Sequence, residues 1–562
     1  MIGVLAKPGQ LDVVEEFFQL FKTPWEYYRP EGVYSAVIAT CADVSNVSAR
    51  VLLVYGAEAK SVDAQEGIIR GGRAQSACLN LGEAQVPIYG DTCTFTAFAN
   101  GRSCVVAGTE VLGVRTAGSN STMIRMGYDL FEEVRHLLVN AQPFEYANIP
   151  TLDAHIDMLR TWIVEEGNAL VEIPSVPSGY SFTACLTHDI DFIGIRHHKL
   201  DHTMLGFLYR STVGAARNLF RGKTNLRRAL KIWRAAATLP LVYLGWAEDF
   251  WEPFEWYLAA EKDLPATYFL IPFKRRAGDK VTGAHASRRA SAYDVSDLTI
   301  QAETLQKHGC ELGVHGLDAW HSVEHGRAEL ERVRSVSKAP ETGVRMHWLL
   351  QDATTYQVLE DAGFAYDSTA GYNETVGYRN GTTQVFRPLG ARTLLEIPIH
   401  IQDGALFLHN RLNLTDAQAR QRCRPLFDNA RKYGGVLTVL WHDRSHGPER
   451  FWGGFYLELI ERLKSLGVWF GSAGQVVQWF GQRRAVRFEP VETTNGVRVR
   501  LTCAGEDVRP AFTIRVHAPG GGESARTGAA FSDLRWDGKR PEEIDLPLKF
   551  ENEAAVARPS HS

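Results

Sequence analysis

The stretch that decides the fold is Thr187-His188-Asp189-Ile190-Asp191, which follows an apolar run at residues 181–186. The apolar run predicts a buried strand, and the histidine and two acids at its end mark a change from core to chemistry. Side chains alternate along extended backbone, so Asp189 and Asp191 point to the same side. One carboxylate can then hold a divalent ion while the other takes a proton from water on that ion. Considered alone, the pentapeptide fits an acidic turn that caps the next helix equally well.

The same pattern recurs between residues 265 and 480, where short apolar strands end in polar residues and helix-like stretches follow. Strands separated by helices imply parallel pairing, and α/β barrels keep their active sites at the carboxyl ends of their strands. The strand-end residues, in chain order, are Asp191, His315, Arg345, Asp367, His400 and His442. Because six such endings exceed what folding alone requires, we expect a distorted (β/α) barrel with its reactive residues at one mouth.

The chain of 562 residues is too long for a single hydrophobic core, so several domains are expected. Residues 1–150 show the alternating strand and helix patterns of an α/β accessory domain, and residues 151–180 are predicted to form a linker. The barrel is expected over residues 181–482. The composition then changes to alternating strands, which predict a small β-rich module over residues 483–552 and a disordered tail over residues 553–562.

Composition limits the classes of function. A net charge of −4 gives no argument for nucleic-acid binding, and the eight scattered cysteines include no C-x-x-C motif. Buried thiols in a reducing compartment are therefore expected. The first residues lack the long apolar segment of a secretory signal, and no apolar stretch reaches the ~20 residues of a membrane helix. These features favour a cytoplasmic protein, with peripheral attachment to the inner membrane as the alternative.

A basic insertion follows the opening strand, at about residues 194–245. Between Arg196 and Arg234 the sequence holds ten lysines or arginines and one acid, Asp201, with apolar residues interleaved at helical spacing. An ordinary helical insertion with a solvated basic face is the favoured interpretation. The alternative is an interfacial patch that meets anionic lipid or a glycolipid phosphate.

The strand-end residues resemble the motifs of the polysaccharide deacetylases, the NodB-homology domain of carbohydrate esterase family four, over about residues 180–480. In that family the first motif carries a base and a metal ligand, which match Asp189 and Asp191. The second motif supplies a histidine ligand that matches His315. The third carries an arginine that steadies the base, here Arg345, and the last carries a catalytic histidine, here His442. The resemblance thus implies a deacetylase-type barrel with a divalent metal, for which zinc is expected.

The sequence departs from the family pattern in two motifs. The second motif normally has histidines four residues apart, but Ala319 occupies the second position. We therefore expect His321, two residues later, to be the third metal ligand, although Asp318 could replace it. The usual arginine-proline pair of the third motif is replaced by Met346 and His347, which indicates a divergent subfamily. His347 itself is interpreted as a structural histidine.

Four further residues are predicted to line the substrate site: Asp318, Asp367, Arg379 and Trp441. Each has a plainer interpretation. Asp318 could cap the next helix, and Arg379 could brace a turn. Trp441, beside His442, could stack on a sugar face or pack in the core. Asp367 lies in the stretch that resembles the fourth family motif.

The resemblance and the chemistry together predict a metal-dependent hydrolase that removes the acetyl group from an N-acetylated sugar in a glycan or glycolipid. Asp189 would take a proton from water, Arg345 would keep Asp189 ionised, and His442 would stabilise the oxyanion or protonate the amine. A hydrolase of a non-sugar amide or imide is a second hypothesis, because fold does not fix substrate. A non-catalytic glycan-binding scaffold is a third.

Overall fold

The computed structural model describes residues 1–74, 78–81, 84–118, 121–222, 225–493, 496–504, 507–518 and 531–546. The predicted tail at residues 553–562 lies outside this part of the chain. The chain divides into two compact units. Unit 1 comprises residues 1–141, 149–179 and 479–562, and unit 2 comprises residues 142–148 and 180–478.

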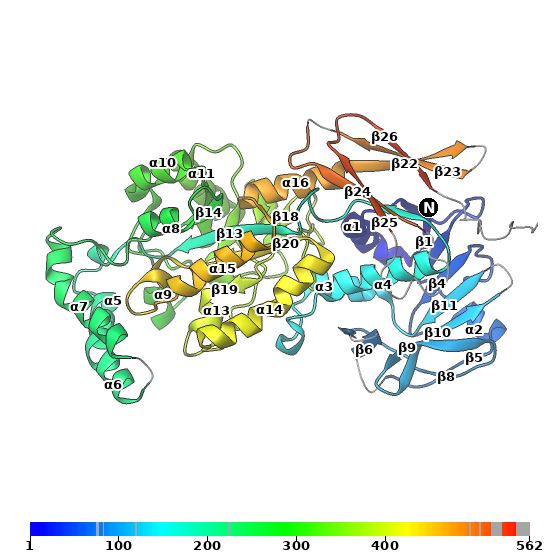
Figure 1. Cartoon of the computed structure of the whole chain (residues 1–562), viewed down its shortest axis with the longest axis horizontal. Coiled ribbons are helices and arrows are strands. Elements are labelled where there is room, and N and C mark those ends of the chain that lie inside the picture. Colours follow the sequence, from blue (N-terminus) through cyan, green and yellow to red (C-terminus); the bar gives the residue numbers. More distant parts are fainter. Residues whose placement is uncertain are drawn as a thin grey trace, which may run out of the picture. The chain divides into compact units, whose positions relative to one another are not determined.

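Unit 2 is built on one sheet in which every strand pairing is parallel. The strands are β13 (Thr183–Ile190), β14 (Ala266–Leu270), β15 (Glu311–Gly316), β16 (Val344–Met346), β17 (Tyr366–Asp367), β18 (Leu395–Glu396), β19 (Ile401–Gln402), β20 (Val436–Leu440) and β21 (Trp469–Phe470). Their order is β18-β17-β16-β15-β14-β13-β20-β19, with β21 also paired to β13. This curled sheet, central in unit 2 (Figure 1), confirms the predicted distorted (β/α) barrel.

The crossover helices between these strands follow the predicted alternation. They are α8 (Phe254–Ala260), α9 (Ala284–Arg289), α10 (Thr299–Lys307), α11 (Val323–Ser337), α12 (Thr355–Ala362), α13 (Asp403–Phe407), α14 (Asp416–Tyr433) and α15 (Gly453–Ser465), and α16 (Ala473–Ala485) follows the last strand. Helices and strands share one large apolar core, in which both faces of β13 are buried. Burial on both faces agrees with the mostly apolar run at residues 182–186.

The basic insertion leaves the barrel after β13 and returns at α8. It contains α5 (His202–Tyr209), a short π-helical segment (Arg210–Gly214), α6 (Ala215–Phe220) and α7 (Leu226–Tyr243). Figure 1 shows these helices as an arm that extends beyond the barrel helices. A small core of its own, including Phe207, Leu239 and Trp251, holds the arm together.

Unit 1 contains a mixed sheet of order β2-β1-β3-β4-β11-β10-β9-β6-β7. Its parallel half is β1 (Ile2–Leu5), β2 (Trp25–Tyr27), β3 (Ala36–Ala39), β4 (Val51–Tyr55) and β11 (Thr122–Met126). Its antiparallel half is β6 (Cys78–Leu81), β7 (Ala84–Pro87), β9 (Gly101–Ala107) and β10 (Glu110–Ala117), and β5 (Ile68–Arg70) pairs separately with β8 (Phe95–Phe98). The helices are α1 (Leu11–Phe21), α2 (Ser61–Gln65) and α3 (Leu130–Val139).

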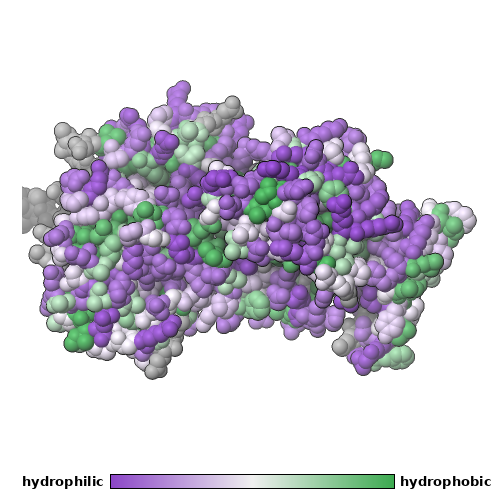
Figure 2. All heavy atoms as spheres, turned by 180° about the vertical axis from the view of Figure 1, so that it is seen from behind, coloured by the Kyte–Doolittle hydropathy of each residue, from purple (hydrophilic) through white to green (hydrophobic). Residues whose placement is uncertain are grey.

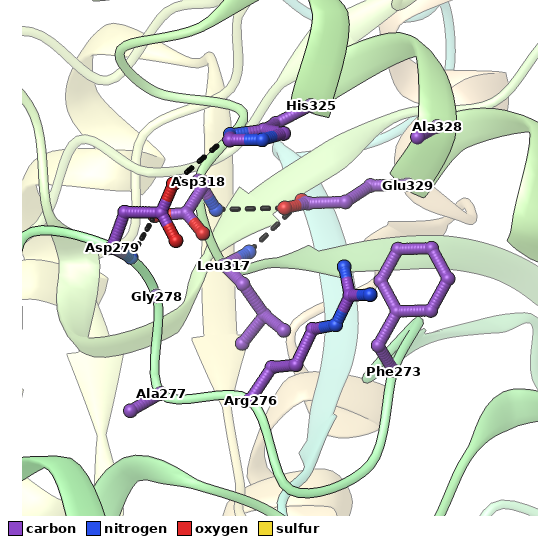
Figure 3. Close-up of a pocket in the computed structure, with 10 residues that line it drawn as sticks. All are labelled: Phe273, Arg276, Ala277, Gly278, Asp279, Leu317, Asp318, His325, Ala328 and Glu329. Atoms are coloured by element: carbon purple, nitrogen blue, oxygen red, sulfur yellow. Dashed lines mark hydrogen bonds and ion pairs between the residues drawn. The ribbon is translucent and has the colours of Figure 1, made fainter.

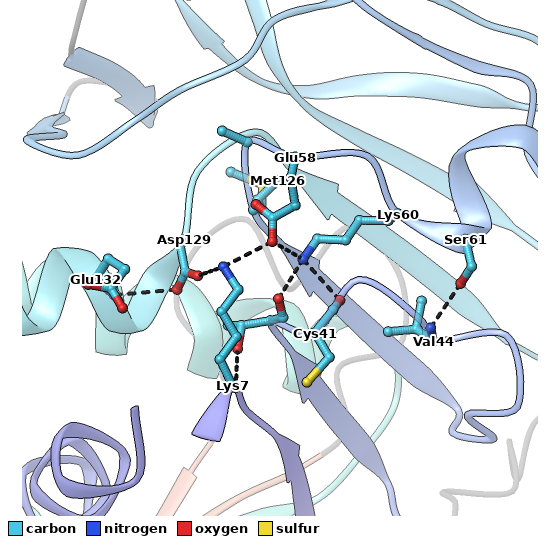
Figure 4. Close-up of polar contacts among 12 residues, drawn as sticks. Lys7, Cys41, Val44, Glu58, Lys60, Ser61, Met126, Asp129 and Glu132 are labelled. Carbon is cyan, nitrogen blue, oxygen red and sulfur yellow. Dashed lines mark hydrogen bonds and ion pairs between the residues drawn. The ribbon is translucent and has the colours of Figure 1, made fainter. Parts of the chain in front are cut away.

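Charged side chains gather where the parallel strands of unit 1 end (Figure 4). Lys7 Nζ lies 2.9 Å from a carboxylate oxygen of Glu58 and 2.8 Å from one of Asp129, and Lys60 Nζ lies 2.9 Å from Glu58. Asp129 also caps α3 by accepting from the backbone N–H groups of Phe131 and Glu132. The buried Lys60 ammonium therefore has a carboxylate partner, as a buried charge requires, and the partly exposed Lys7 joins Glu58 to Asp129.

The rest of unit 1 joins segments that are distant in sequence. Residues 151–180, predicted as a linker, contain α4 (Thr151–Glu165) and β12 (Leu170–Glu172). β12 pairs with β24 (Phe512–His517), which pairs with β25 (Phe531–Trp536), and β22 (Val486–Thr493), β23 (Gly496–Cys503) and β26 (Glu542–Leu546) form a second three-stranded sheet. The predicted β-rich module at the C-terminal side is therefore part of the same compact unit as residues 1–141.

No helix in the described part of the chain is both long enough and apolar enough to cross a membrane.

Candidate metal centre

Three potential metal ligands converge beside the ends of neighbouring barrel strands. One ligand atom from each of Asp191, His315 and His347 lies within 4.8 Å of the other two. The Nε2 atoms of His315 and His347 lie 3.4 Å and 3.3 Å from the same oxygen, Asp191 Oδ1. Two imidazole nitrogens and a carboxylate are a ligand set typical of zinc and other divalent metals.

The strand register explains why these residues meet. Ile190 on β13 and Val314 on β15 both pair with Leu270 on β14, so they lie at the same level of the sheet. Asp191 and His315 are each the next residue along their strands. β16 lies beside β15 and ends at Met346, directly before His347. Parallel strands thus deliver all three side chains to one edge, as barrels generally do.

No hydrogen bond links the facing acceptor atoms of this cluster. His315 Nδ1 lies 3.0 Å from the carbonyl oxygen of Arg345, so Nδ1 carries the proton and Nε2 presents a lone pair. Within the described part of the chain, no hydrogen-bond donor reaches Asp191 Oδ1 and no partner reaches His347 Nδ1. Lone pairs that face one another in a buried site repel unless a cation joins them, so the residues fit a bound divalent metal.

The protonation states agree with a ligand role. Burial lowers the pKa of His347 well below its usual value, despite the opposite effect of Asp191. Burial alone would raise the pKa of Asp191, but His347, His315 and His442 together lower it below its usual value. A neutral imidazole and an ionised carboxylate are the forms that coordinate metals.

Asp189 lies next to these potential metal ligands and is fixed by Arg345. Its Oδ2 is 3.7 Å from His315 Nε2, and its Oδ1 accepts a hydrogen bond of 3.0 Å from Arg345 Nη1. Arg345 is fully buried and also donates to the hydroxyl of Thr187 and to both the carbonyl and the hydroxyl of Ser368. The bonds to Thr187 and Ser368 fix the guanidinium, so its one hydrogen bond to Asp189 has a set direction and orients the carboxylate. The predicted pairing of Arg345 with Asp189 is therefore present in the structure.

His442, at the end of β20, is paired with a carboxylate that the sequence analysis did not identify. Its Nδ1 lies 2.6 Å from Oδ1 of Asp403, and its backbone N–H donates to Asp403 Oδ2 at 2.9 Å. Burial alone would lower the pKa of His442, but Asp403, with Asp191 and Asp189 nearby, raises it to about 9. The imidazole is therefore protonated at neutral pH, and its Nε2–H can act as an acid.

The structure does not place His321 in the metal cluster, contrary to the expected ligand set. His321 Nε2 lies 3.0 Å from Oδ1 of Asp318, in the loop between β15 and α11. Asp318 also accepts from the backbone N–H of Asp279, and it forms a second group of possible ligands with Asp279 and His325 (Figure 3). The physical reason is the course of this loop, which carries residues 318–321 away from Asp191, while His347 on the adjacent strand end takes the third position.

The other predicted substrate residues lie in different surroundings. Trp441 is fully buried in the barrel core against Phe407 and Phe455, which favours packing over sugar stacking. Asp367 is buried opposite Glu396 on the neighbouring strand. Burial raises the pKa of Asp367 to about 6 and that of Glu396 well above its usual value, so the pair holds a proton at neutral pH. Both guanidinium Nη atoms of Arg379 lie 3.0 Å from the side-chain amide of Gln351.

Two neighbours of His347 hold its position. Arg289 is buried, and its Nη2 donates to the carbonyl oxygens of His347 and Leu317 at 3.0 Å each. Trp348 and Leu349, directly after His347, have positive φ angles of 67° and 55°. Consecutive non-glycine residues in this conformation are strained, and such strain concentrates at functional sites.

Comparisons with known proteins concern the fold. No protein-family model matches the chain, and no match was found among curated proteins. Solved structures similar to it include the carbohydrate deacetylase Agd3, which is 11% identical, with a TM-score of 0.36, 97% of this chain covered and 98% of that one. A Mycobacterium smegmatis protein assigned as a polysaccharide deacetylase is 18% identical (TM-score 0.32; 55% and 94% covered), and PuuE allantoinase is 13% identical (TM-score 0.32; 54% and 92%). The chemistry proposed below therefore rests on this chain's own residues.

Proposed function

We propose that the protein is a metal-dependent hydrolase that removes the acetyl group from an N-acetylated sugar. The observation that carries this proposal is the arrangement around Asp191, with its two histidines, an arginine-fixed carboxylate on one side and a protonated histidine nearby. Amide hydrolysis needs these three elements together: activated water, a base and an acid for the departing amine.

Asp191, His315 and His347 would hold the metal, for which zinc fits the two imidazoles and one carboxylate. When bound, the ion supplies a Lewis acid and lowers the pKa of water toward ~7. This replaces His321 with His347 in the expected ligand set. The remaining chemistry belongs to side chains that do not bind the ion.

Asp189 acts as the base. It takes a proton from the attacking water, whose oxygen forms a bond with the acetyl carbonyl carbon. Arg345 orients Asp189 through its hydrogen bond, so it is a positioning residue. His442 gives the proton from Nε2 to the amine nitrogen as the C–N bond breaks, which releases acetate and the free amino sugar. His442 regains a proton from solvent, and Asp403 favours this reprotonation by stabilising the positive charge.

Trp348 is the aromatic residue best placed to contact a sugar ring. Its side chain is 38% exposed, and its ring centroid lies 5.8 Å from that of His347. Its backbone carbonyl accepts a hydrogen bond from Asn373 at 3.1 Å, which helps fix the strained loop. An exposed ring beside the reactive centre can cover the apolar face of a pyranose, a role that the buried Trp441 cannot perform.

The experiment is acetate release from a panel of N-acetylated and O-acetylated oligosaccharides, together with simple cyclic amides and imides. The proposal predicts acetate from N-acetylated sugars after zinc loading, and loss of at least about a hundredfold in kcat for Asp189→Asn. Asp416→Asn, at an exposed helix start, is the matched control and should keep full activity. Ring opening of an imide without acetate release, or full activity of Asp189→Asn, would overturn the proposal.

A further inference from the structure

The arm between β13 and α8 is rich in basic residues and in exposed hydrophobic side chains. Residues 202–247 contain eight lysines and arginines and no acid, in a chain whose net charge is −4. Of the 22 large hydrophobic side chains that are exposed among the described residues, ten lie between Leu200 and Trp246. Exposed apolar residues scattered singly are normal, but a concentration of this kind marks an interaction surface.

On the first half of the arm these apolar residues form a stripe. Leu205, Tyr209 and Val213 follow one another at intervals of four, and Phe220, which is 92% exposed, continues the same side. The buried residues of this segment are different ones, namely Met204, Phe207, Ser211 and Ala215, of which Met204 and Phe207 belong to the arm's own core. The segment thus has two apolar faces: one is buried in the arm, and the other is exposed.

α7 repeats this arrangement. Its buried residues are Ala229, Ile232, Ala235, Leu239 and Val242. Its exposed apolar residues are Leu226, Leu230 and Leu241, followed by Leu244 just beyond the helix, at spacings that again place them on one side. Figure 2 shows hydrophobic surface along this projecting arm, interspersed with hydrophilic residues.

Basic side chains accompany both stripes and remain available. Within the described part of the chain, no acidic side chain pairs with Arg217, Arg221 or Arg227, whereas Lys231 and Arg234 line a cavity that also contains acidic side chains. Arg210 is different, because it pairs with Glu449 at 2.6 Å. Apolar residues flanked by unpaired arginines and lysines are the composition of helices that lie in the interface of an anionic bilayer.

The arm is fixed at the rim of the metal centre. Asp249 accepts hydrogen bonds from the backbone N–H groups of Ile195 and Arg196 at 2.9 Å each, which ties the two ends of the arm together. Ile195 is only four residues after the ligand Asp191. The guanidinium of Arg444, two residues after His442, lies over the ring of Phe192 at 3.8 Å. A surface bound by the arm would therefore lie near the mouth of the barrel.

We propose that the exposed stripes of α5–α6 and α7, with their unpaired basic residues, form a docking surface for an anionic lipid bilayer. A second copy of the chain is a poorer occupant, because a symmetric contact would place like charges against one another. Docking of this kind would hold the barrel mouth close to the membrane. It does not depend on which reaction the metal centre performs.

The test is co-sedimentation of the full chain with vesicles of phosphatidylcholine, with and without phosphatidylglycerol. We expect binding to the mixed vesicles, weak binding to pure phosphatidylcholine, and release at high salt. Each basic residue should contribute about fivefold to the partition coefficient, so Arg217→Gln/Arg221→Gln/Arg227→Gln should weaken binding roughly a hundredfold. Phe220→Ser/Leu226→Ser should also weaken binding, since it removes the apolar anchor.

Matched controls separate docking from general charge and hydrophobicity. Arg102→Gln/Arg535→Gln removes exposed arginines elsewhere, and Val33→Ser removes an apolar side chain that is 88% exposed. Both controls should bind vesicles like the original chain. Equal binding by the arm variants and the controls, absence of binding to the mixed vesicles, or a dimer in sedimentation velocity that Phe220→Ser/Leu226→Ser dissociates would each overturn the proposal.

Discussion

His442 Nδ1 lies 2.6 Å from Oδ1 of Asp403, although the two residues are 39 positions apart in the chain. Asp403 is fully buried at the start of α13, and it also accepts from the hydroxyl of Ser445. The Asp403 carboxylate thus stabilises the positive charge on His442, which allows His442 to act as an acid.

Replacing Asp403 by asparagine should therefore change the pH dependence of activity. The pKa of His442 is raised to about 9, so the acid form is present below that pH and is lost as the pH rises through it. Removing the carboxylate lowers the pKa, and the alkaline limb of kcat/KM should move to lower pH. An unchanged alkaline limb in Asp403→Asn, measured beside Asp416→Asn as control, would contradict this role of Asp403.

Arg345 should be essential for both stability and activity. Arg345→Leu leaves Asp189 buried without its cationic partner, and breaking a buried pair from one side costs roughly 3–5 kcal/mol. Arg345→Lys keeps the charge but loses the contacts with Ser368, so it should retain more stability than activity. Thermal unfolding and kcat measured on both variants check this. Equal stability of Arg345→Leu and the original chain would contradict it.

Much of the barrel was predictable because its strands have a strong local signal. Apart from Thr183, residues 182–186 are apolar since β13 is buried on both faces, and the titratable residues appear where the strand ends. Because side chains alternate along a strand, His188 and Asp189 lie on opposite faces of the sheet. His188 points to the other side, where its Nε2 lies 2.6 Å from the buried Glu261 and its Nδ1 lies 2.9 Å from the carbonyl of Trp441.

The third potential ligand was harder to predict because spacing within one motif does not determine which strand end completes a site. His321 is close to His315 in sequence, yet its loop turns toward Asp318. His347 is 32 residues from His315 and reaches the cluster because β15 and β16 are neighbours in the sheet. Its position directly after Arg345 and Met346 was the available signal. Asp403 had no such signal, because it lies beyond the strand ends.

The free energy of unfolding of unit 1 should fall at low pH because of Glu172. Burial alone raises the pKa of this carboxyl, but Arg160 and His517 lower it to about 2, below the usual 4.5. A lowered pKa means that the stabilisation is complete above pH 4.5 and is lost as the pH falls toward 2. The contribution is on the order of 3 kcal/mol. Urea unfolding of Glu172→Gln should show lower stability at pH 7 and a flatter pH dependence in this window. The same slope in both proteins would contradict the assignment.

The central claim is that His347, rather than His321, completes the metal centre with Asp191 and His315. The most direct measurement is the zinc content of purified His347→Ala and His321→Ala after equilibration with the metal and gel filtration. We expect the original chain and His321→Ala to retain zinc, and His347→Ala to lose affinity by at least about tenfold. Retention of zinc by His347→Ala together with its loss from His321→Ala would contradict the account.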